Sequence, residues 1–198
     1  IDDICFIGGY QIDKVRADYP NFTFRHNQDW ENNNILLSLM HAEDLMDGPF
    51  ICCYSDILFT PNLISGLLAS DKDITLAVDV GWEERYQHRT QHPPDDAEKL
   101  SGSNGSVDAA HAHGEYTGIA KFSTQGASLL KEHFNRCQEQ YAGKPFREAK
   151  VFEKSYKILL FQEMLEAGVA MHHTDTAGEY IEIDTQEDFE LAQTQWKG

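Results

Sequence analysis

The chain has 198 residues, of which 41% are hydrophobic, and its 33 acidic residues outnumber 16 basic ones to give a formal net charge of −17. This length and hydrophobic content indicate a globular protein with its own core and argue against disorder. Such an acidic surface repels phosphate backbones, which excludes general nucleic-acid binding, and no apolar run has the length of a membrane span. The four cysteines are typical of a reducing compartment, so we predict a cytoplasmic protein.

Short apolar runs alternate along the chain with segments of helical period. In chain order, the pattern predicts strand 4–7, helix 11–19, strand 22–24, helix 35–46, strand 49–54, helix 61–69, strand 74–80, strand 115–123, helix 124–140, helix 152–167, strands 169–174 and 180–183, and helix 185–196. The run 49–54 is almost continuously apolar, as in a central strand, and Thr185 and Asp188 have the spacing of a capping box. The alternation predicts an α/β fold, a Rossmann-like three-layer α/β/α sandwich with a mixed, mostly parallel sheet.

The polar stretch 81–114 interrupts this pattern with prolines, glycines and serines. Because it is too short for a core of its own, we interpret it as an insertion of loops or a hairpin within a single domain spanning 1–198. The sequence opens on Ile1 inside a strand-like run that ends at Gly8-Gly9. We therefore expect that preceding residues are absent from this sequence and that the domain is incomplete at its N-terminus.

Acidic residues fall at the carboxyl ends of two predicted strands, which is where open α/β sheets bind ligands. Asp56 follows the strand 49–54, and Glu182 and Asp184 lie on or just after the strand 180–183. At the strand period of two, Glu182 and Asp184 point to one face and form a hard oxygen site suited to Mg²⁺. The alternative is that Asp184 caps the last helix, Glu182 is a solvated strand residue and Asp56 is a turn residue.

The stretch 82–94 mixes cationic and aromatic side chains. Such a mixture can hold a small anionic or cationic ligand, through arginine forks or through an aromatic face. The alternative is a solvated loop whose aromatic side chains fold back onto the protein.

Taken together, ordered blocks of the sequence resemble the nucleotidyltransferases that act on sugar phosphates and phosphocholine, the NTP-transferase group of GT-A-like folds. The blocks are Asn33-Asn34-Ile35-x-x-Ser38-Leu39, Tyr54-Ser55-Asp56-Ile57-Leu58-Phe59 and Tyr180-Ile181-Glu182-Ile183-Asp184-Thr185-x-Glu187-Asp188. A further block, Trp82…Tyr86…Arg89-Thr90-x-His92-Pro93, is similar to the branch with phosphocholine and aminoethylphosphonate cytidylyltransferases. The resemblance spans essentially the whole chain.

The resemblance implies an enzyme that transfers a nucleotidyl group, with a cytidylyl group favoured, from an NTP to a small phosphate or phosphonate and releases pyrophosphate. Mg²⁺ is the implied cofactor. The implied metal-binding positions are Asp56, Glu182 and Asp184, of which Asp56 and Asp184 are implied to be catalytic. Asn34 and Ser38 are implied to lie near the nucleotide. The residues implied to border the acceptor pocket are Trp82, Tyr86, Arg89, Glu115 and Tyr116.

The sequence departs from the family at its start, because members begin with a strand, a glycine-rich loop carrying an arginine, and a lysine-bearing segment. Two other functions therefore stay open: a nucleotide-binding or regulatory homologue without turnover, and a GT-A-type glycosyltransferase. The second is the weaker, since the strand end offers Ser55-Asp56-Ile57 instead of a DxD motif. The expected partners are an NTP, with CTP favoured, and the acceptor, without nucleic acid or membrane. Association into a homodimer is left open.

Overall fold

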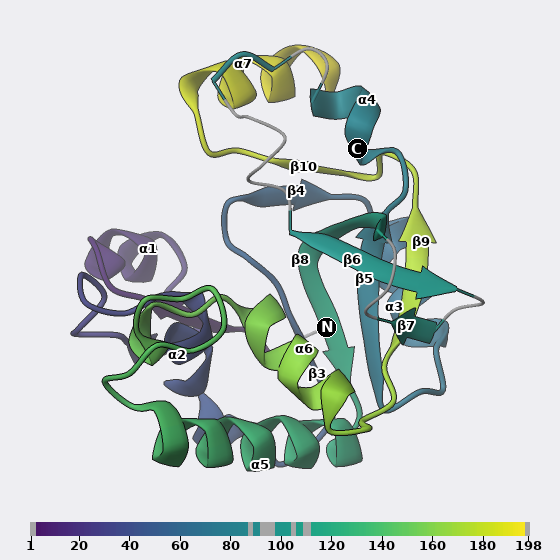
Figure 1. The fold of residues 1–198 in the computed structure, drawn as a ribbon. Coiled ribbons are helices and arrows are strands. Elements are labelled where there is room, and N and C mark those ends of the chain that lie inside the picture. The colour runs from purple at the N-terminus through teal and green to yellow at the C-terminus, as the bar shows by residue number, and fades with distance from the viewer. Residues whose placement is uncertain (1–2, 87–88, 92–97, 104–105, 109–111, 197–198) are drawn as a thin grey trace. The chain divides into compact units, whose positions relative to one another are not determined.

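The computed structural model describes residues 3–86, 89–91, 98–103, 106–108 and 112–196 (Figure 1). Contacts cluster into two compact units, each built from two chain segments: unit 1 contains residues 1–48 and 127–167, and unit 2 contains residues 49–126 and 168–198. No helix in the described ranges is both long and apolar enough to cross a bilayer. The acidic and aromatic residues predicted to form the site belong mostly to unit 2.

Unit 1 contains a small parallel βαβ arrangement and several helices (Figure 1). Strand β1 (Cys5–Gly8) pairs in parallel with β2 (Thr23–His26), and helix α1 (Ile12–Asp18) connects them, as the sequence pattern predicts. The other elements are α2 (Ile35–Met40), the 3₁₀ helix η1 (Glu43–Leu45), most of α5 (Thr124–Tyr141), the 3₁₀ helix η3 (Phe152–Lys154) and α6 (Lys157–Glu166).

Two helices predicted in unit 1 are broken. The predicted helix 35–46 ends as α2 at Met40 and continues only as η1. The predicted helix 152–167 is divided at Ser155, whose backbone is extended and whose carbonyl accepts a hydrogen bond from the Leu36 N–H at 3.3 Å. This hydrogen bond joins residues 119 positions apart, and it outweighs the local helical pattern. A periodicity that is read over neighbouring residues cannot predict such a long-range contact.

Unit 2 is built around a six-stranded sheet in the order β3-β8-β5-β9-β7-β6 (Figure 1). Its strands are β3 (Phe50–Cys52), β5 (Ile74–Asp79), β6 (Lys99–Ser103), β7 (Ser106–Asp108), β8 (Ala112–Phe122) and β9 (His172–Thr176). A separate antiparallel pair joins β4 (Ile57–Phe59) to β10 (Tyr180–Glu182). The helices are α3 (Pro61–Ala69), α4 (Trp82–Tyr86) and α7 (Gln186–Gln195).

The α/β fold class is confirmed, with a more strongly mixed sheet than the strand–helix alternation predicts. In unit 2, β5 and β9 pair in parallel, whereas β8 runs antiparallel to each of the strands it pairs with, β3, β5 and β6. The prediction of a central strand at 49–54 is wrong, because β3 stands at the edge of the sheet and pairs with β8. Its apolar side chains are covered by packing, as in the stacked rings of Phe50 and Phe122.

The core of unit 2 forms where α3 lies against the sheet. Leu63 and Leu67 of α3 are buried with Ala77 of β5, Ile119 of β8 and Tyr180 of β10. This packing ties the short β4–β10 pair, and hence the acidic residues around it, to the sheet.

The insertion 81–114 contains structure that the sequence predicted only in outline. It supplies the short helix α4 and the antiparallel hairpin of β6 and β7. His92 and Pro93 of the block 82–93 lie outside the described residues.

Candidate active site

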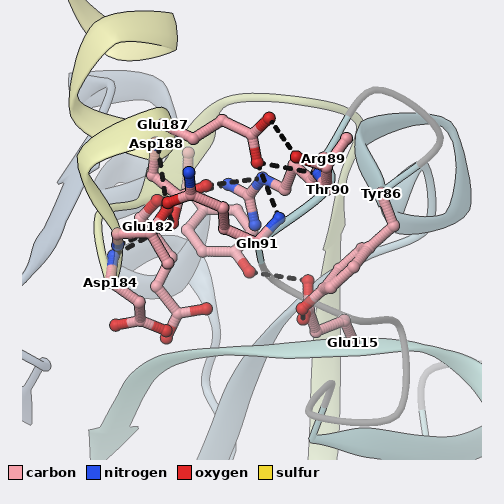
Figure 2. Close-up of polar contacts among 11 residues, drawn as sticks. Tyr86, Arg89, Thr90, Gln91, Glu115, Glu182, Asp184, Glu187 and Asp188 are labelled. Carbon is pink, nitrogen blue, oxygen red and sulfur yellow. Dashed lines mark hydrogen bonds and ion pairs between the residues drawn. The ribbon is translucent and has the colours of Figure 1, made fainter.

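Acidic residues of unit 2 gather around the end of the β4–β10 pair. Glu182 is the last residue of β10 and lies opposite Ile57 of β4. The Ile183 N–H donates to the Asp56 carbonyl at 2.8 Å, so the strand pairing extends by one position and brings Asp56 beside Glu182 and Asp184. Figure 2 shows the side chains of Glu182 and Asp184 directed to the same side, as their spacing of two predicts.

The carboxyl group of Glu182 has the most perturbed environment of this group. Its pKa is raised to about 8, first by burial and then by the negative charges of Asp184, Glu115, Asp56 and Glu98. Asp56 and Asp184 themselves are exposed. The arrangement thus concentrates negative charge around one half-buried carboxyl group, and a cation would relieve that repulsion.

Asp184 does not cap the last helix with its side chain. The cap of α7 is a capping box in which the Thr185 hydroxyl accepts the Asp188 N–H at 3.1 Å and the Asp188 carboxylate accepts the Thr185 N–H at 2.9 Å. The predicted capping box is therefore confirmed. The alternative that the Asp184 side chain caps α7 is therefore not supported, because Thr185 and Asp188 form the cap.

A second carboxylate, Glu115 of β8, is 2% exposed and lies between two tyrosines (Figure 2). The Tyr86 hydroxyl donates to its Oε1 at 2.6 Å, and the Tyr180 hydroxyl donates to its Oε2 at 2.7 Å. Burial, followed by the charge of Glu115, raises the pKa of Tyr86, so this phenol stays protonated and donates. Hydrogen bonds to both oxygens make it possible to bury a carboxylate here.

Aromatic side chains extend from this carboxylate along α4 and β8. Trp82 meets Tyr86 edge-on with ring centroids 5.7 Å apart, and Tyr116 meets Tyr54 in the same way at 6.2 Å. The Tyr54 hydroxyl donates to the Glu98 carboxylate at 3.0 and 3.1 Å. Burial is the main cause that raises the pKa values of Tyr54 and Tyr116, so both phenols also stay protonated.

Arg89 lies in the short segment after α4, and its side chain is almost completely buried. Its Nε is 3.1 Å from Oδ1 of Asp188, and its Nη2 donates to the Glu182 carbonyl at 3.2 Å. Its guanidinium carbon is 5.3 Å from the centre of the Tyr86 ring. The cation predicted to border the acceptor pocket is thus engaged with the C-terminal helix and with the strand that carries Glu182.

Asn34 and Ser38 belong to unit 1, where both take part in local structure. The Asn34 side chain accepts the Ile35 N–H at 2.8 Å and is the N-cap of α2. The Ser38 hydroxyl accepts a hydrogen bond from Asn27 at 2.7 Å, and Asn27 also exchanges two hydrogen bonds with Asn33. The nucleotide role of Asn34 and Ser38 stays a prediction.

Several residues of the site were missed by the sequence analysis. Tyr180 lies two positions before Glu182 on β10, so the period of two could have placed it on the same face. Asp79 ends β5, is fully buried and accepts the N–H groups of Gly81 and Gly178 at 2.8 and 3.4 Å. The pairing of Asp188 with Arg89 spans 99 positions and leaves no signal in local spacing.

No metal site with three protein ligands is preformed in the described part of the chain, when histidine, cysteine, aspartate and glutamate are considered. A metal site that uses fewer protein ligands is compatible with this finding. Magnesium is commonly held by one or two carboxylates, with substrate phosphates and water completing its shell.

Comparison with known proteins shows that the chain is similar to nucleotidyltransferases. No family model matches it. The CTP:phosphoglutamine cytidylyltransferase of Campylobacter jejuni is 24% identical over an alignment of 208 positions, which covers 96% of this chain and 81% of that protein. The inositol-1-phosphate CTP transferase of T. maritima has a TM-score of 0.71 at 15% identity, covering 100% of this chain and 78% of the other.

The CTP:phosphocholine cytidylyltransferase of Streptococcus pneumoniae has a TM-score of 0.65 at 13% identity and covers 98% of this chain and 78% of the other. At these identities the solved structures establish the fold. The resemblance predicted from the sequence is confirmed, and with it the prediction of an enzyme of the nucleotidyltransferase class.

Proposed function

We propose that this protein transfers a cytidylyl group from CTP to the phosphate or phosphonate of a small acceptor and releases pyrophosphate. The observation that carries the proposal is the group of carboxylates at the end of the β4–β10 pair, Asp56, Glu182 and Asp184, in a protein with the nucleotidyltransferase fold. The choice of CTP is supported by the relatives, which are named for CTP and for three different phosphorylated acceptors.

The carboxylates fit a bound Mg²⁺. Asp56 and Asp184 are exposed and Glu182 is half-buried beside them, so hard oxygen donors are available at the surface. When bound, the ion supplies charge neutralisation for the triphosphate and for the pyrophosphate that leaves. The residues that would hold it are Glu182 and Asp184, with Asp56 next to them.

In this reaction the protein mainly has to position the two substrates and stabilise their negative charge. An oxygen of the acceptor phosphate attacks the α-phosphorus of the nucleotide, and the bond between that phosphorus and the oxygen bridging to the β-phosphate breaks. The attacking oxygen is already anionic at neutral pH, so no general base is required, and the leaving pyrophosphate takes the electron pair. Such reactions are accelerated mainly by alignment and electrostatic stabilisation.

On the acceptor side, the residues of unit 2 provide a rigid wall. Glu115 holds the hydroxyls of Tyr86 and Tyr180, which fixes both rings. Trp82 packs on Tyr86, and Tyr116 packs on Tyr54. Of these rings, those of Trp82 and Tyr54 are partly exposed, and we place the non-reacting part of the acceptor against them. A wall of aromatic rings and carboxylates suits a small group that carries an amine, ammonium, amide or several hydroxyls.

The test is pyrophosphate release by the full-length protein with Mg²⁺, each of CTP, ATP, GTP and UTP, and a panel of acceptors. The panel holds phosphocholine, 2-aminoethylphosphonate, phosphoglutamine, inositol 1-phosphate and sugar 1-phosphates. We expect release that requires CTP and one acceptor and that is lost in Glu182→Gln. The matched control is Glu132→Gln, which neutralises an exposed carboxylate on α5. Absence of release across the whole panel from folded protein would reject the proposal and favour a regulatory homologue.

A further inference from the structure

Arg89 has the features of a structural cation, although the sequence places it among substrate-binding residues. Its side chain is 2% exposed, and that of its partner Asp188 is 0% exposed. A guanidinium is costly to bury unless an opposite charge neutralises it, and Asp188 does so. Burial alone would raise the pKa of Asp188, but hydrogen bonds from Thr185 and the charge of Arg89 bring it below its ordinary value.

The ion pair is connected to the backbone of both candidate metal ligands on β10 and after it. Arg89 Nη2 donates directly to the carbonyl of Glu182 at 3.2 Å. On the far side of the pair, Oδ2 of Asp188 accepts the N–H groups of Asp184 and Thr185 at 3.2 and 2.9 Å. Arg89 therefore fixes one end of the segment 182–185 itself and fixes the other end through Asp188 (Figure 2).

The segment that carries Arg89 is in turn clasped by α7. The carboxylate of Glu187 accepts the N–H groups of Thr90 and Gln91 at 2.7 and 2.9 Å and the Thr90 hydroxyl at 2.9 Å. These backbone hydrogen bonds lower the pKa of Glu187. Toward β8, the guanidinium lies over the ring of Tyr86. One buried cation thus joins the aromatic wall to the acidic strand end.

We infer that Arg89 is a positioning residue that sets the backbone of Glu182 and Asp184 for metal binding and makes no contact with the acceptor phosphate. The inference rests on the proposed function for its catalytic consequence. Its structural content is independent of that function: loss of either partner of the buried pair loosens the segment 182–185. A residue that bound the acceptor would leave that segment and the metal unaffected.

The test compares Arg89→Gln and Asp188→Asn in the full-length protein, with Arg136→Gln as matched control. Arg136 also pairs with a carboxylate, Glu163, but on the exposed surface of unit 1. Three quantities are measured: amide hydrogen exchange at Asp184 and Thr185, the Mg²⁺ dissociation constant by calorimetry, and kcat and KM for CTP and acceptor.

We expect both variants at the buried pair to speed exchange at the two amides and to weaken Mg²⁺ binding, each by about tenfold or more. The value of kcat should fall while the acceptor KM changes less than about threefold. The double variant should be no worse than either single variant, because the two side chains act as a unit. Arg89→Lys, which keeps the charge but loses the planar fork, should recover part of the Mg²⁺ affinity.

The contrary results are distinct. An acceptor KM raised about tenfold in Arg89→Gln but unchanged in Asp188→Asn would make Arg89 a substrate ligand and overturn the inference. Unchanged exchange and Mg²⁺ binding in both variants would overturn it as well. If the unmodified protein transfers no nucleotidyl group, the proposed function fails, while hydrogen exchange still decides the positioning role. If Arg89→Gln does not fold, Arg89→Lys, which keeps the charge, takes its place in the comparison with Asp188→Asn.

Discussion

The two tyrosine hydroxyls that donate to Glu115 lead us to predict how much stability Tyr180→Phe loses. Tyr180 is 2% exposed, and its hydroxyl lies 2.7 Å from Oε2 of Glu115. The substitution removes one oxygen and leaves the ring packing intact. A hydrogen bond to a charged group contributes about 1.5–3 kcal/mol, so we expect a loss of about 2 kcal/mol in the free energy of unfolding. For a chain of this size that corresponds to a fall of about 4–8 °C in Tm.

The measurement is urea denaturation and thermal unfolding followed by circular dichroism. Tyr156→Phe is the matched control, because it removes the same atom from a ring that is 51% exposed, and its effect should stay within about 0.5 kcal/mol. In a background of Glu115→Gln, Tyr180→Phe should cost about 1 kcal/mol less, since the charge that the hydroxyl solvates is gone. Equal stabilities of Tyr180→Phe and Tyr156→Phe would refute the reasoning about this buried carboxylate.

Three further predictions concern the acidic strand end and the aromatic wall. The pKa of Glu182 is about 8 in the folded protein and 4.5 in an unfolded chain. In the absence of metal, the protonated form of Glu182 therefore stabilises the folded state. This stabilisation is fully present below about pH 4.5 and is lost as the pH rises through 8. Between pH 5 and 8 in EDTA the unmodified protein should lose about 1–2 kcal/mol relative to Glu182→Gln, after allowance for solvent screening, and parallel Tm profiles of the two proteins would contradict this. Asp184→Asn should weaken Mg²⁺ binding about tenfold or more in a calorimetric titration, whereas an unchanged titration would remove Asp184 from the metal site. Gly118 has φ +79°, and a Cβ there would lie 2.3 Å from the Tyr54 ring, so Gly118→Ala should lower the free energy of unfolding by about 2–4 kcal/mol in urea denaturation. The control is Gly143→Ala, because Gly143 is exposed and has open space around it. Equal losses at both positions would show that the Tyr54 ring can move aside.

The sequence determined the features that depend on neighbours along the chain. Helix α3 spans the predicted range 61–69, and Thr185 with Asp188 caps α7 as their spacing predicts. The spacing of two between Glu182 and Asp184 was enough to direct both side chains to one side, because a strand alternates its faces whatever it pairs with. The fold class and the acidic strand end could therefore be predicted.

Only the tertiary structure decided which distant residues meet. The break at Ser155 follows from its bond to Leu36, and the edge position of β3 follows from how β8 pairs, and neither leaves a mark in local periodicity. The same holds for Arg89. The local sequence pattern of an arginine among aromatic residues is the same whether the arginine faces a ligand or a buried carboxylate. Its pairing with Asp188 is set by packing between segments 99 positions apart, and burial makes that partner obligatory.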